Sequence, residues 1–241
     1  MIVRTFKRIV EFLFPPACPV CGAPVSCHGE LCRDCWGCFE WIDGAKCSHC
    51  GYPFGGDLEP SVDIMCPVCA SGKCELDWIR SACVYDDASR NVMLPFKHCG
   101  KIKYATFMAR AMIWALRDVN VDCDIVMPVP LARPRLIHRT YNQATLLARP
   151  IARAVGCPLD VDSVHRRHRP AMGHMTPCQR LKNISGVFSV AHPERIRGRK
   201  ILLVDDVFTS GATFSELRRV LMRAGASAVY GITFCRVRRT I

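Results

Sequence analysis

Four Cys-x-x-Cys pairs lie within the first eighty residues, and they limit what this part of the chain can fold into more than any other feature. Such a pair on a tight turn points two thiolates at one spot, and two turns supply the four soft ligands of a tetrahedral Zn²⁺ site. The segments between the pairs are rich in Gly and Pro and short of core-forming residues, so metal would supply the missing folding free energy. The candidate ligands are Cys18, Cys21, Cys32, Cys35, Cys47, Cys50, Cys66 and Cys69.

Pairing of neighbouring motifs predicts two sites, one within residues 18–35 and the other within residues 47–69. Both sites would be closed, without an open coordination position, which is typical of structural rather than catalytic zinc. A single site, crossed pairing of the motifs, disulfides and an iron–sulfur cluster stay open as alternatives. Further side chains that could replace a ligand are Cys27, His28, Cys38, His49 and Cys74.

Cysteine is concentrated near the start of the chain, where 12 of the 17 fall between Cys18 and Cys83. In a secreted protein that density would indicate disulfides. The N-terminal segment argues against secretion, because charged residues interrupt its apolar run and no small-residue cleavage site follows. We therefore expect a cytoplasmic protein whose paired cysteines bind metal.

The apolar residues within 2–13 recur at helical spacing and stop before Pro15 and Pro16. They predict a short amphipathic helix that packs against the chain's own core, with membrane contact as the alternative. No apolar run in the sequence approaches the ~20 residues that span a bilayer, so no membrane span is expected.

Charge divides the 241 residues as sharply as cysteine does. The net charge is +12, yet residues 1–80 hold seven basic and ten acidic side chains and are net acidic. Residues 81–241 hold 26 basic and 11 acidic side chains, an excess of +15. Such an excess suits polyanions, either nucleic acid or small molecules with several phosphates. We expect a zinc ribbon domain over 1–80 and a separate domain over 81–241.

Strand-like and helix-like patterns alternate through the second part of the chain. This alternation predicts an α/β domain with a largely parallel sheet covered on both faces, whose ligands bind beyond the carboxyl ends of the strands. Pro150 predicts a kink or break in its helix, and Thr176 is a candidate N-cap. The expected strands span 79–87, 123–130, 158–164, 200–207 and 226–237, and the expected helices 103–119, 141–156, 176–185 and 212–225.

Two adjacent carboxylates, Asp205 and Asp206, end the apolar strand pattern of 200–207. Burying unpaired charge is unfavourable, so these groups require cations, metal or hydroxyl donors. The residues that follow precede a helix, whose first backbone amides and positive dipole end would hold a phosphate. Carboxylates for hydroxyls beside amides for a phosphate describe a sugar-phosphate site. The cradle residues are Thr209, Ser210, Gly211, Ala212 and Thr213.

The stretch ILLVDDVFTSGAT, residues 201–213, resembles the phosphoribosyl-pyrophosphate motif of type I phosphoribosyltransferases. The resemblance implies that Asp205 and Asp206 contact the ribose hydroxyls, with Mg²⁺ nearby, and that the Thr/Ser/Gly run holds the 5′-phosphate. By position, the loop that cradles pyrophosphate in that fold corresponds to residues 131–139. Its candidate ligands for the leaving group are Arg133, Arg135 and Arg139.

The order of motifs along nearly the whole chain resembles the ComF family. Four Cys-x-x-Cys pairs are followed by LPFKHCGKIKYA (94–105), MPVPLARPRLIHRTYNQATLLA (127–148) and the acidic motif. Members combine an N-terminal zinc ribbon with a type I phosphoribosyltransferase-like domain, and in competent bacteria they are tied to DNA uptake. The resemblance implies phosphoribosyl pyrophosphate as ligand and the DNA-uptake machinery as a candidate partner. This sequence departs from the family pattern at Met172 and Pro150, which affects the expected mobile loop, residues 165–182.

Three basic clusters, residues 164–170, 195–200 and 236–239, each suggest a solvated face, and together they favour single-stranded nucleic acid. Lys97 and Lys101 fit either the pocket or the surface, while Asn142 and Gln143 fit either the pocket or a helix start. The sequence thus leads to a phosphoribosyltransferase with unknown acceptor. The alternatives are a DNA-binding protein with a vestigial or sensory pocket, and an adaptor that docks through its zinc ribbon. The cysteines outside the pairs that we expect to act as small apolar side chains are Cys83, Cys99, Cys123, Cys157, Cys178 and Cys235.

Overall fold

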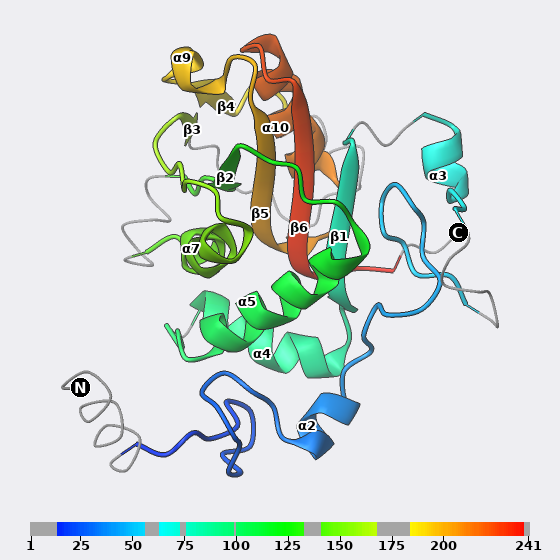
Figure 1. Cartoon of the computed structure of the whole chain (residues 1–241), viewed down its shortest axis with the longest axis vertical. Helices are drawn as coiled ribbons and strands as arrows, with labels where there is room; N and C mark the ends of the chain where they lie inside the picture. Colours follow the sequence, from blue (N-terminus) through cyan, green and yellow to red (C-terminus); the bar gives the residue numbers. More distant parts are fainter. Residues whose placement is uncertain are drawn as a thin grey trace.

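A four-stranded parallel sheet forms the centre of the molecule in the computed structural model, which describes residues 14–55, 63–72, 76–98, 100–132, 141–167 and 184–238. The strand order is β1-β6-β5-β2, and all three pairings are parallel, as the alternating pattern predicts. The central strands run side by side in Figure 1. The strands are β1 (Trp78–Val84), β2 (Ile125–Pro128), β5 (Lys200–Phe208) and β6 (Ala228–Arg236).

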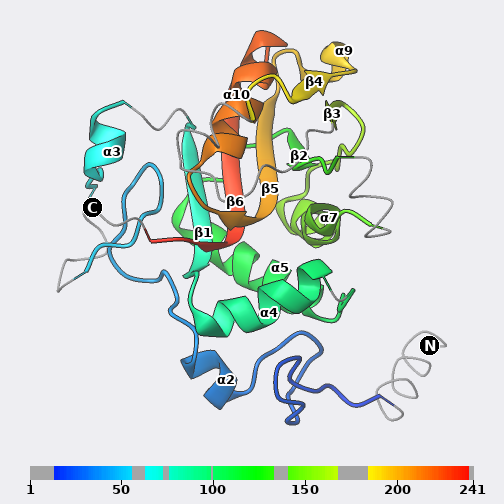
Figure 2. The same ribbon diagram turned by 180° about the vertical axis from the view of Figure 1, so that it is seen from behind.

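Helices cover both faces of this sheet (Figures 1 and 2). One face carries α5 (Tyr104–Ala115) and α7 (Gln143–Val155), and the other carries α10 (Ala212–Arg223). The helix expected over 103–119 ends earlier than predicted, because α5 stops at Ala115 and a 3-10 turn, η1 (Leu116–Asp118), follows it. A further helix, α4 (Asp87–His98), follows β1 and packs against α5.

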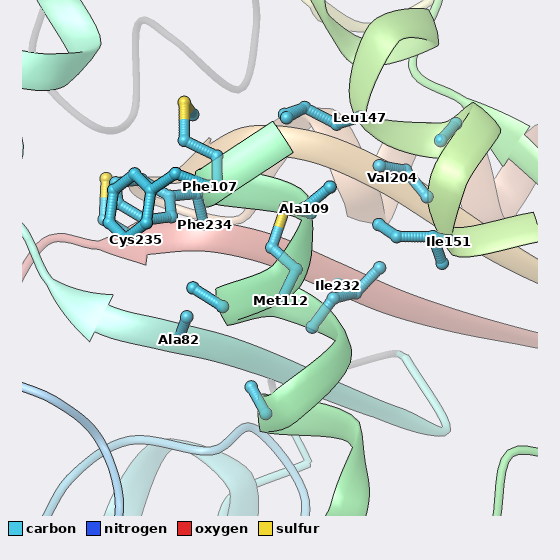
Figure 3. Close-up of a cluster of buried hydrophobic side chains, with 14 of the residues drawn as sticks. Ala82, Phe107, Ala109, Met112, Leu147, Ile151, Val204, Ile232, Phe234 and Cys235 are labelled. Atoms are coloured by element: carbon cyan, nitrogen blue, oxygen red, sulfur yellow. The ribbon is translucent and has the colours of Figure 1, made fainter. Parts of the chain in front are cut away.

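Alternate residues of β5 face two separate cores. Leu202 and Val204 join the core beneath α5 and α7, where Val204 lies close to Leu147 and Ile151 of α7 (Figure 3). Ile201 and Leu203 join the opposite core, which includes the apolar side of α10. Because both faces of the strand are buried, its sequence is a continuous apolar run rather than an alternating one.

Pro150 does not break its helix. α7 is continuous from Gln143 to Val155 with Pro150 inside it, and Gly156 ends it in the left-handed conformation with φ +73°. The predicted break is therefore wrong. Leu147, Ala148, Ile151 and Ala152 on either side of the proline are all buried, and this packing against the sheet outweighs the hydrogen bond that proline removes.

The strand expected at 158–164 does not form as such. Leu159 makes one isolated bridge to Val126 of β2, and the Asp160 side chain then accepts hydrogen bonds from the amides of Asp162 and Ser163. This local turn competes with strand formation. The chain enters a strand only at β3 (Val164–Arg166), which pairs antiparallel with β4 (Phe188–Val190) outside the main sheet.

The cysteine-rich region contacts β1 of the main sheet through its backbone. It contains two short helices, α2 (Arg33–Gly37) and α3 (Pro67–Ala70). Between them, Trp41 bridges antiparallel to Cys83 of β1, and the Val84 amide donates to the Glu40 carbonyl. The Phe39 ring packs edge-on against Phe107, at 5.6 Å between centroids.

Several expectations fall outside the described residues, namely the helix within 2–13 and the N-cap at Thr176. None of the helices in the described part of the chain has both the length and the apolar character to cross a bilayer.

Candidate functional site

The two acidic residues lie in the second half of β5, close to its carboxyl end. β5 continues to Phe208, so the strand is one residue longer than its pattern suggested. Asp205 is half-buried and Asp206 is buried, with 8% of its surface exposed. The Asp206 amide donates to Oδ1 of Asp205 at 2.9 Å. The sheet thus holds both carboxylates near the carboxyl end of β5, where ligands bind in open parallel sheets of this kind.

α4 brings a cation to this pair. Lys97 Nζ lies 3.0 Å from Oδ1 of Asp206, and only 11% of the Asp206 side chain is exposed. Gln143, at the start of α7, donates from Nε2 to the Lys97 carbonyl and fixes the backbone there. Lys97, which the sequence left open between pocket and surface, therefore belongs to the site, whereas Lys101 is exposed.

Electrostatics differ between the two acids. Burial and the neighbouring Asp206 carboxylate raise the pKa of Asp205 to about 7, against the opposing charges of Lys97 and Arg166. Burial works against the charged form of Lys97, but the Asp206 carboxylate, together with Asp205 and Cys235, raises the pKa of this lysine. Among the described residues, Lys97 pairs with Asp206 and no cation pairs with Asp205. A cation or a hydroxyl donor from a ligand would complete the environment of Asp205.

A tight loop follows β5 and leads directly into α10. Gly211 is the N-cap of this 12-residue helix and has φ +82° and ψ −6°, a left-handed conformation that strains other residues. The Ala212 amide donates to Oγ of Ser210 at 3.4 Å, and Thr209 is exposed. Ser210 and Thr213 are half-buried, and these hydroxyls and the helix N-terminal amides together form a site suited to an anion. We call residues 209–213 the phosphate loop.

Two groups of four cysteines are the candidate metal centres. Cys18, Cys21, Cys32 and Cys35 form the first cluster, and Cys47, Cys50, Cys66 and Cys69 form the second; in each, the sulfur atoms lie within 4.8 Å of one another. Pairing is therefore between neighbouring motifs, as predicted. Of the spare candidates, Cys27, His28, Cys38 and His49 belong to neither cluster, and Cys74 lies outside the described residues.

The donor set of each cluster fits a tetrahedral zinc ion. Four soft sulfur ligands surround one point, and backbone amides donate to the sulfurs, as from Cys35 to Cys32 Sγ at 3.5 Å and from Cys66 to Cys47 Sγ at 3.2 Å. Both clusters are thus compatible with structural zinc.

Comparison with known proteins supports the same organisation. A double zinc ribbon domain matches residues 9–72, and a phosphoribosyl transferase domain matches residues 142–240. The chain is 28% identical to the "DNA utilization protein YhgH" of Escherichia coli K12, over 92% of this chain and 97% of that protein. It is 26% identical to "Competence protein F" of Haemophilus influenzae, over 82% of this chain and 93% of the relative. It is also 26% identical to "Competence protein ComFC" of Bacillus subtilis, over 83% of this chain and 80% of that protein.

The chain is similar to proteins of the ComF family along most of its length. It has an N-terminal cysteine-rich double zinc ribbon followed by a parallel sheet of the type I phosphoribosyltransferase kind. Among solved structures it is similar to an adenine phosphoribosyltransferase from Thermoanaerobacter pseudethanolicus at 14% identity, over 56% of this chain and 69% of that one, with a TM-score of 0.34.

The other candidate site residues lie elsewhere in the fold or outside the described residues. Arg133, Arg135 and Arg139 are outside, as is most of the expected mobile loop, residues 165–182. Asn142 is the N-cap of α7, where Oδ1 accepts from the Ala144 amide and Nδ2 donates to the Val129 carbonyl. Its contacts explain it as a helix start.

The sequence analysis missed that two arginines are buried. Arg236 was grouped with a solvated basic cluster, 236–239, and that assignment is wrong for it, because it ends β6 with 1% of its surface exposed. Its guanidinium donates to the Cys50 carbonyl. Arg80 of β1 is 6% exposed and donates to the carbonyls of Ser48 and His49. A charged residue within an apolar strand pattern was the available signal.

Proposed function

We propose that this protein binds phosphoribosyl pyrophosphate at the carboxyl edge of β5 and acts as a phosphoribosyltransferase. The supporting observation is one continuous unit in which two carboxylates on β5 precede the phosphate loop and the N-terminus of α10. Carboxylates accept hydrogen bonds from a ribose diol, and the loop amides and helix dipole suit its 5′-phosphate.

The reaction would displace pyrophosphate from the first carbon of the ribose through an oxocarbenium-like state. Asp205 and Asp206 would hold the sugar, and Lys97, with Nζ 3.0 Å from Oδ1 of Asp206, fixes the orientation of that carboxylate. Mg²⁺ bound with the substrate would neutralise charge on the pyrophosphate. Arg133, Arg135 and Arg139 are the proposed partners of the leaving group. The acceptor that attacks the ribose carbon is not defined by these residues.

Titration calorimetry with phosphoribosyl pyrophosphate and Mg²⁺ tests this proposal. We expect Asp205→Asn combined with Asp206→Asn to weaken binding about 100-fold or more, because each hydrogen bond to a charged group contributes about 1.5–3 kcal/mol. Asp162→Asn is the matched control, since it removes an exposed carboxylate outside this unit. Equal affinity in the double variant and the wild type would refute the assignment of the site.

A second candidate function, single-stranded DNA binding, is favoured by the position of two basic clusters. The pairing of β3 with β4, and the step from β4 into α9 (Pro193–Ile196), bring the residues around 164–167 and 195–200 into one small lobe. Arg167, Arg195, Arg197 and Arg199 are all exposed there. The relatives named for DNA utilisation and competence support the same link to DNA.

Fluorescence anisotropy with a labelled single-stranded oligonucleotide tests this candidate. We expect the affinity to fall steeply with salt, and the triple change of Arg195, Arg197 and Arg199 to Gln to weaken binding and flatten the salt dependence. A control of equal charge changes the exposed Arg90, Arg149 and Arg153 to Gln. Absence of binding at low salt would remove DNA as a direct ligand.

An adaptor role of the zinc ribbon cannot be tested by deleting the ribbon, because the deletion would also disturb the rest of the fold. Removing residues 1–80 would delete part of β1, the Phe39 contact with α5 and the second cysteine cluster, all of which join the shared cores. Point substitutions on the exposed first cluster are the better test of partner binding.

A further inference from the structure

The guanidinium of Arg236 lies between two aromatic rings from distant parts of the chain. Its central carbon is 5.2 Å from the ring centroid of Tyr52 and 5.2 Å from that of Phe208. Tyr52 belongs to the turn of the second cysteine cluster, and Phe208 ends β5 beside the phosphate loop. Cations over aromatic faces are attracted by the ring quadrupole, and more strongly when both are desolvated. Arg236 therefore joins two segments that do not follow one another in sequence.

On the cluster side, the partners of Arg236 are fixed by the turn that carries the metal ligands. The Gly51 amide donates to the Cys47 carbonyl, and the Cys47 amide donates to the Tyr52 carbonyl, both at 2.8 Å. Gly51 has φ +66°, and a Cβ added there would lie 2.8 Å from the Ile79 carbonyl oxygen. The turn is thus pressed directly against β1. Metal binding fixes such a turn, and loss of metal frees it.

On the loop side, two phenylalanines bracket the phosphate loop. Phe208 lies immediately before it and Phe214 lies in the first turn of α10, with their ring centroids 5.7 Å apart. Phe208 is aligned with Arg236 across the β5–β6 pairing, and its carbonyl accepts from the Val237 amide at 2.9 Å. The position of the Phe208 ring, and with it the start of the loop, therefore depends on the end of β6.

We infer that Arg236 is a positioning residue that couples the second cysteine cluster to the phosphate loop, so that metal in the cluster and phosphoribosyl pyrophosphate in the loop stabilise one another. This inference rests on the proposed function for its ligand. Coupling between two binding sites is reciprocal, because each ligand changes the affinity of the other by the same factor. The double zinc ribbon would then be part of the sugar-phosphate site and not only a docking module.

Zinc release from the intact protein measures this coupling without any turnover. An excess of a chromogenic zinc chelator is added in the presence of Mg²⁺, with and without saturating phosphoribosyl pyrophosphate, and release is followed by absorbance. The phase from the first cluster is identified with Cys21→Ser, which removes an exposed ligand of that cluster. We expect the sugar phosphate to slow release from the second cluster about fivefold or more and to leave the first unchanged, within the usual range of coupling between sites.

Variants separate coupling from general stability. Arg236→Met should abolish the effect of the ligand on zinc release. Tyr52→Leu should reduce this effect while leaving Arg236 itself in place at the end of β6. Arg80→Met is the matched control, because Arg80 is also buried and bonded to the same turn but lies on β1, which does not pair with β5. It should speed zinc release while keeping the ligand effect. The Asp205→Asn, Asp206→Asn double variant controls for direct chelation of zinc by the ligand.

The wild-type measurement alone decides the inference even if a variant fails to fold. If phosphoribosyl pyrophosphate binds by calorimetry yet leaves zinc release from the second cluster unchanged, the coupling is refuted and the proposed function stands. If the ligand does not bind, both fall together. A ligand effect that survives in Arg236→Met would exclude this residue as the link.

Discussion

The two cysteine clusters have the same ligand set and very different surroundings. In the first, Cys18 is buried, Cys21 is exposed and Cys32 and Cys35 are half-buried, and the nearby Trp36 is 42% exposed. In the second, all four cysteines are buried, with Cys47 fully inaccessible, and they join the core beneath α10. The same sequence motif therefore forms a partly exposed cluster at the periphery in one place and part of a buried core in the other.

Packing explains the difference. The second cluster lies against the sheet, where Arg80 and Arg236 of β1 and β6 bond to its backbone carbonyls. The first cluster is attached through an aromatic group, in which Trp36 stacks on Trp41 at 4.2 Å between centroids. Loss of a metal frees the turns that it holds, so loss from the second cluster should disturb the main core more than loss from the first.

Loss of one ligand from each cluster gives the largest expected contrast. We expect Cys47→Ser to lower the melting temperature by roughly 10 °C or more or to prevent folding, since structural zinc contributes about 10 kcal/mol or more to folding in small domains. Cys21→Ser should lose one zinc ion and melt only a few degrees lower. Metal analysis together with circular dichroism checks both. Equal melting temperatures for the two variants would show that burial of the second cluster carries no extra stability.

The aromatic attachment of the first region can be divided in the same way. Phe39 is buried and contacts Phe107 and Phe234, so we expect Phe39→Ala to destabilise the protein by about 3–4 kcal/mol. Trp36 is partly exposed, and Trp36→Ala should have a cost of about 1 kcal/mol from lost stacking. Urea unfolding followed by far-UV circular dichroism measures both. A larger effect at Trp36 would place the main attachment at the surface rather than in the core.

Much of this fold follows from the sequence, and the exceptions have identifiable causes. Neighbour pairing of the cysteines and a largely parallel sheet were predicted, because the first depends on local spacing and the second on alternating elements with continuous apolar runs such as 201–204. The break at Pro150 and the strand at 158–164 were wrong. Tertiary burial kept the helix whole, and a carboxylate-capped turn at Asp160 interrupted the strand.

The candidate site was predicted less completely than the fold. Asp205, Asp206 and the phosphate loop are adjacent in sequence, so the sequence alone predicted that they lie together at the end of one strand. The contact of Lys97 with Asp206 depends on how α4 packs, and the burial of Arg236 depends on the cysteine turn that covers it. Neither could be obtained from one segment alone, since each joins residues far apart in the chain.

Two glycines with positive φ test how tightly each cluster is packed. Gly22 in the first cluster has φ +82° and nothing within 4 Å of an added Cβ, while at Gly51 in the second the Cβ would meet the Ile79 backbone. Gly22→Ala should destabilise by about 1 kcal/mol through backbone strain. Gly51→Ala should add steric overlap, for a total of about 3 kcal/mol. Thermal melts of the zinc-loaded proteins measure the difference. Equal effects would mean that the second turn has room to move away from β1.

Ion pairs that join each cluster region to the α5–η1 segment give the smallest expected difference. Glu30, in the first region, pairs with Arg110 of α5 at 3.6 Å, and the two side chains are 40% and 48% exposed. Lys46, which precedes Cys47, pairs with Asp118 of η1 at 2.6 Å, and only 10% of its side chain is exposed. Exposed pairs contribute about 0–1 kcal/mol and are weakened by salt, so Arg110→Met should change stability by about 0.3 kcal/mol or less.

Lys46→Met should have a cost nearer 1 kcal/mol, at the upper end of that range, because its partner atoms are closer and more shielded from water. Urea unfolding at low salt and at 0.5 M NaCl, about the range in which screening is strong, separates the two pairs. The Arg110 effect should vanish in salt and the Lys46 effect should persist. If both ion-pair effects disappear in salt, the Lys46–Asp118 pair is as open to solvent as the Glu30–Arg110 pair. The two regions would then differ only in the burial of their cysteine side chains.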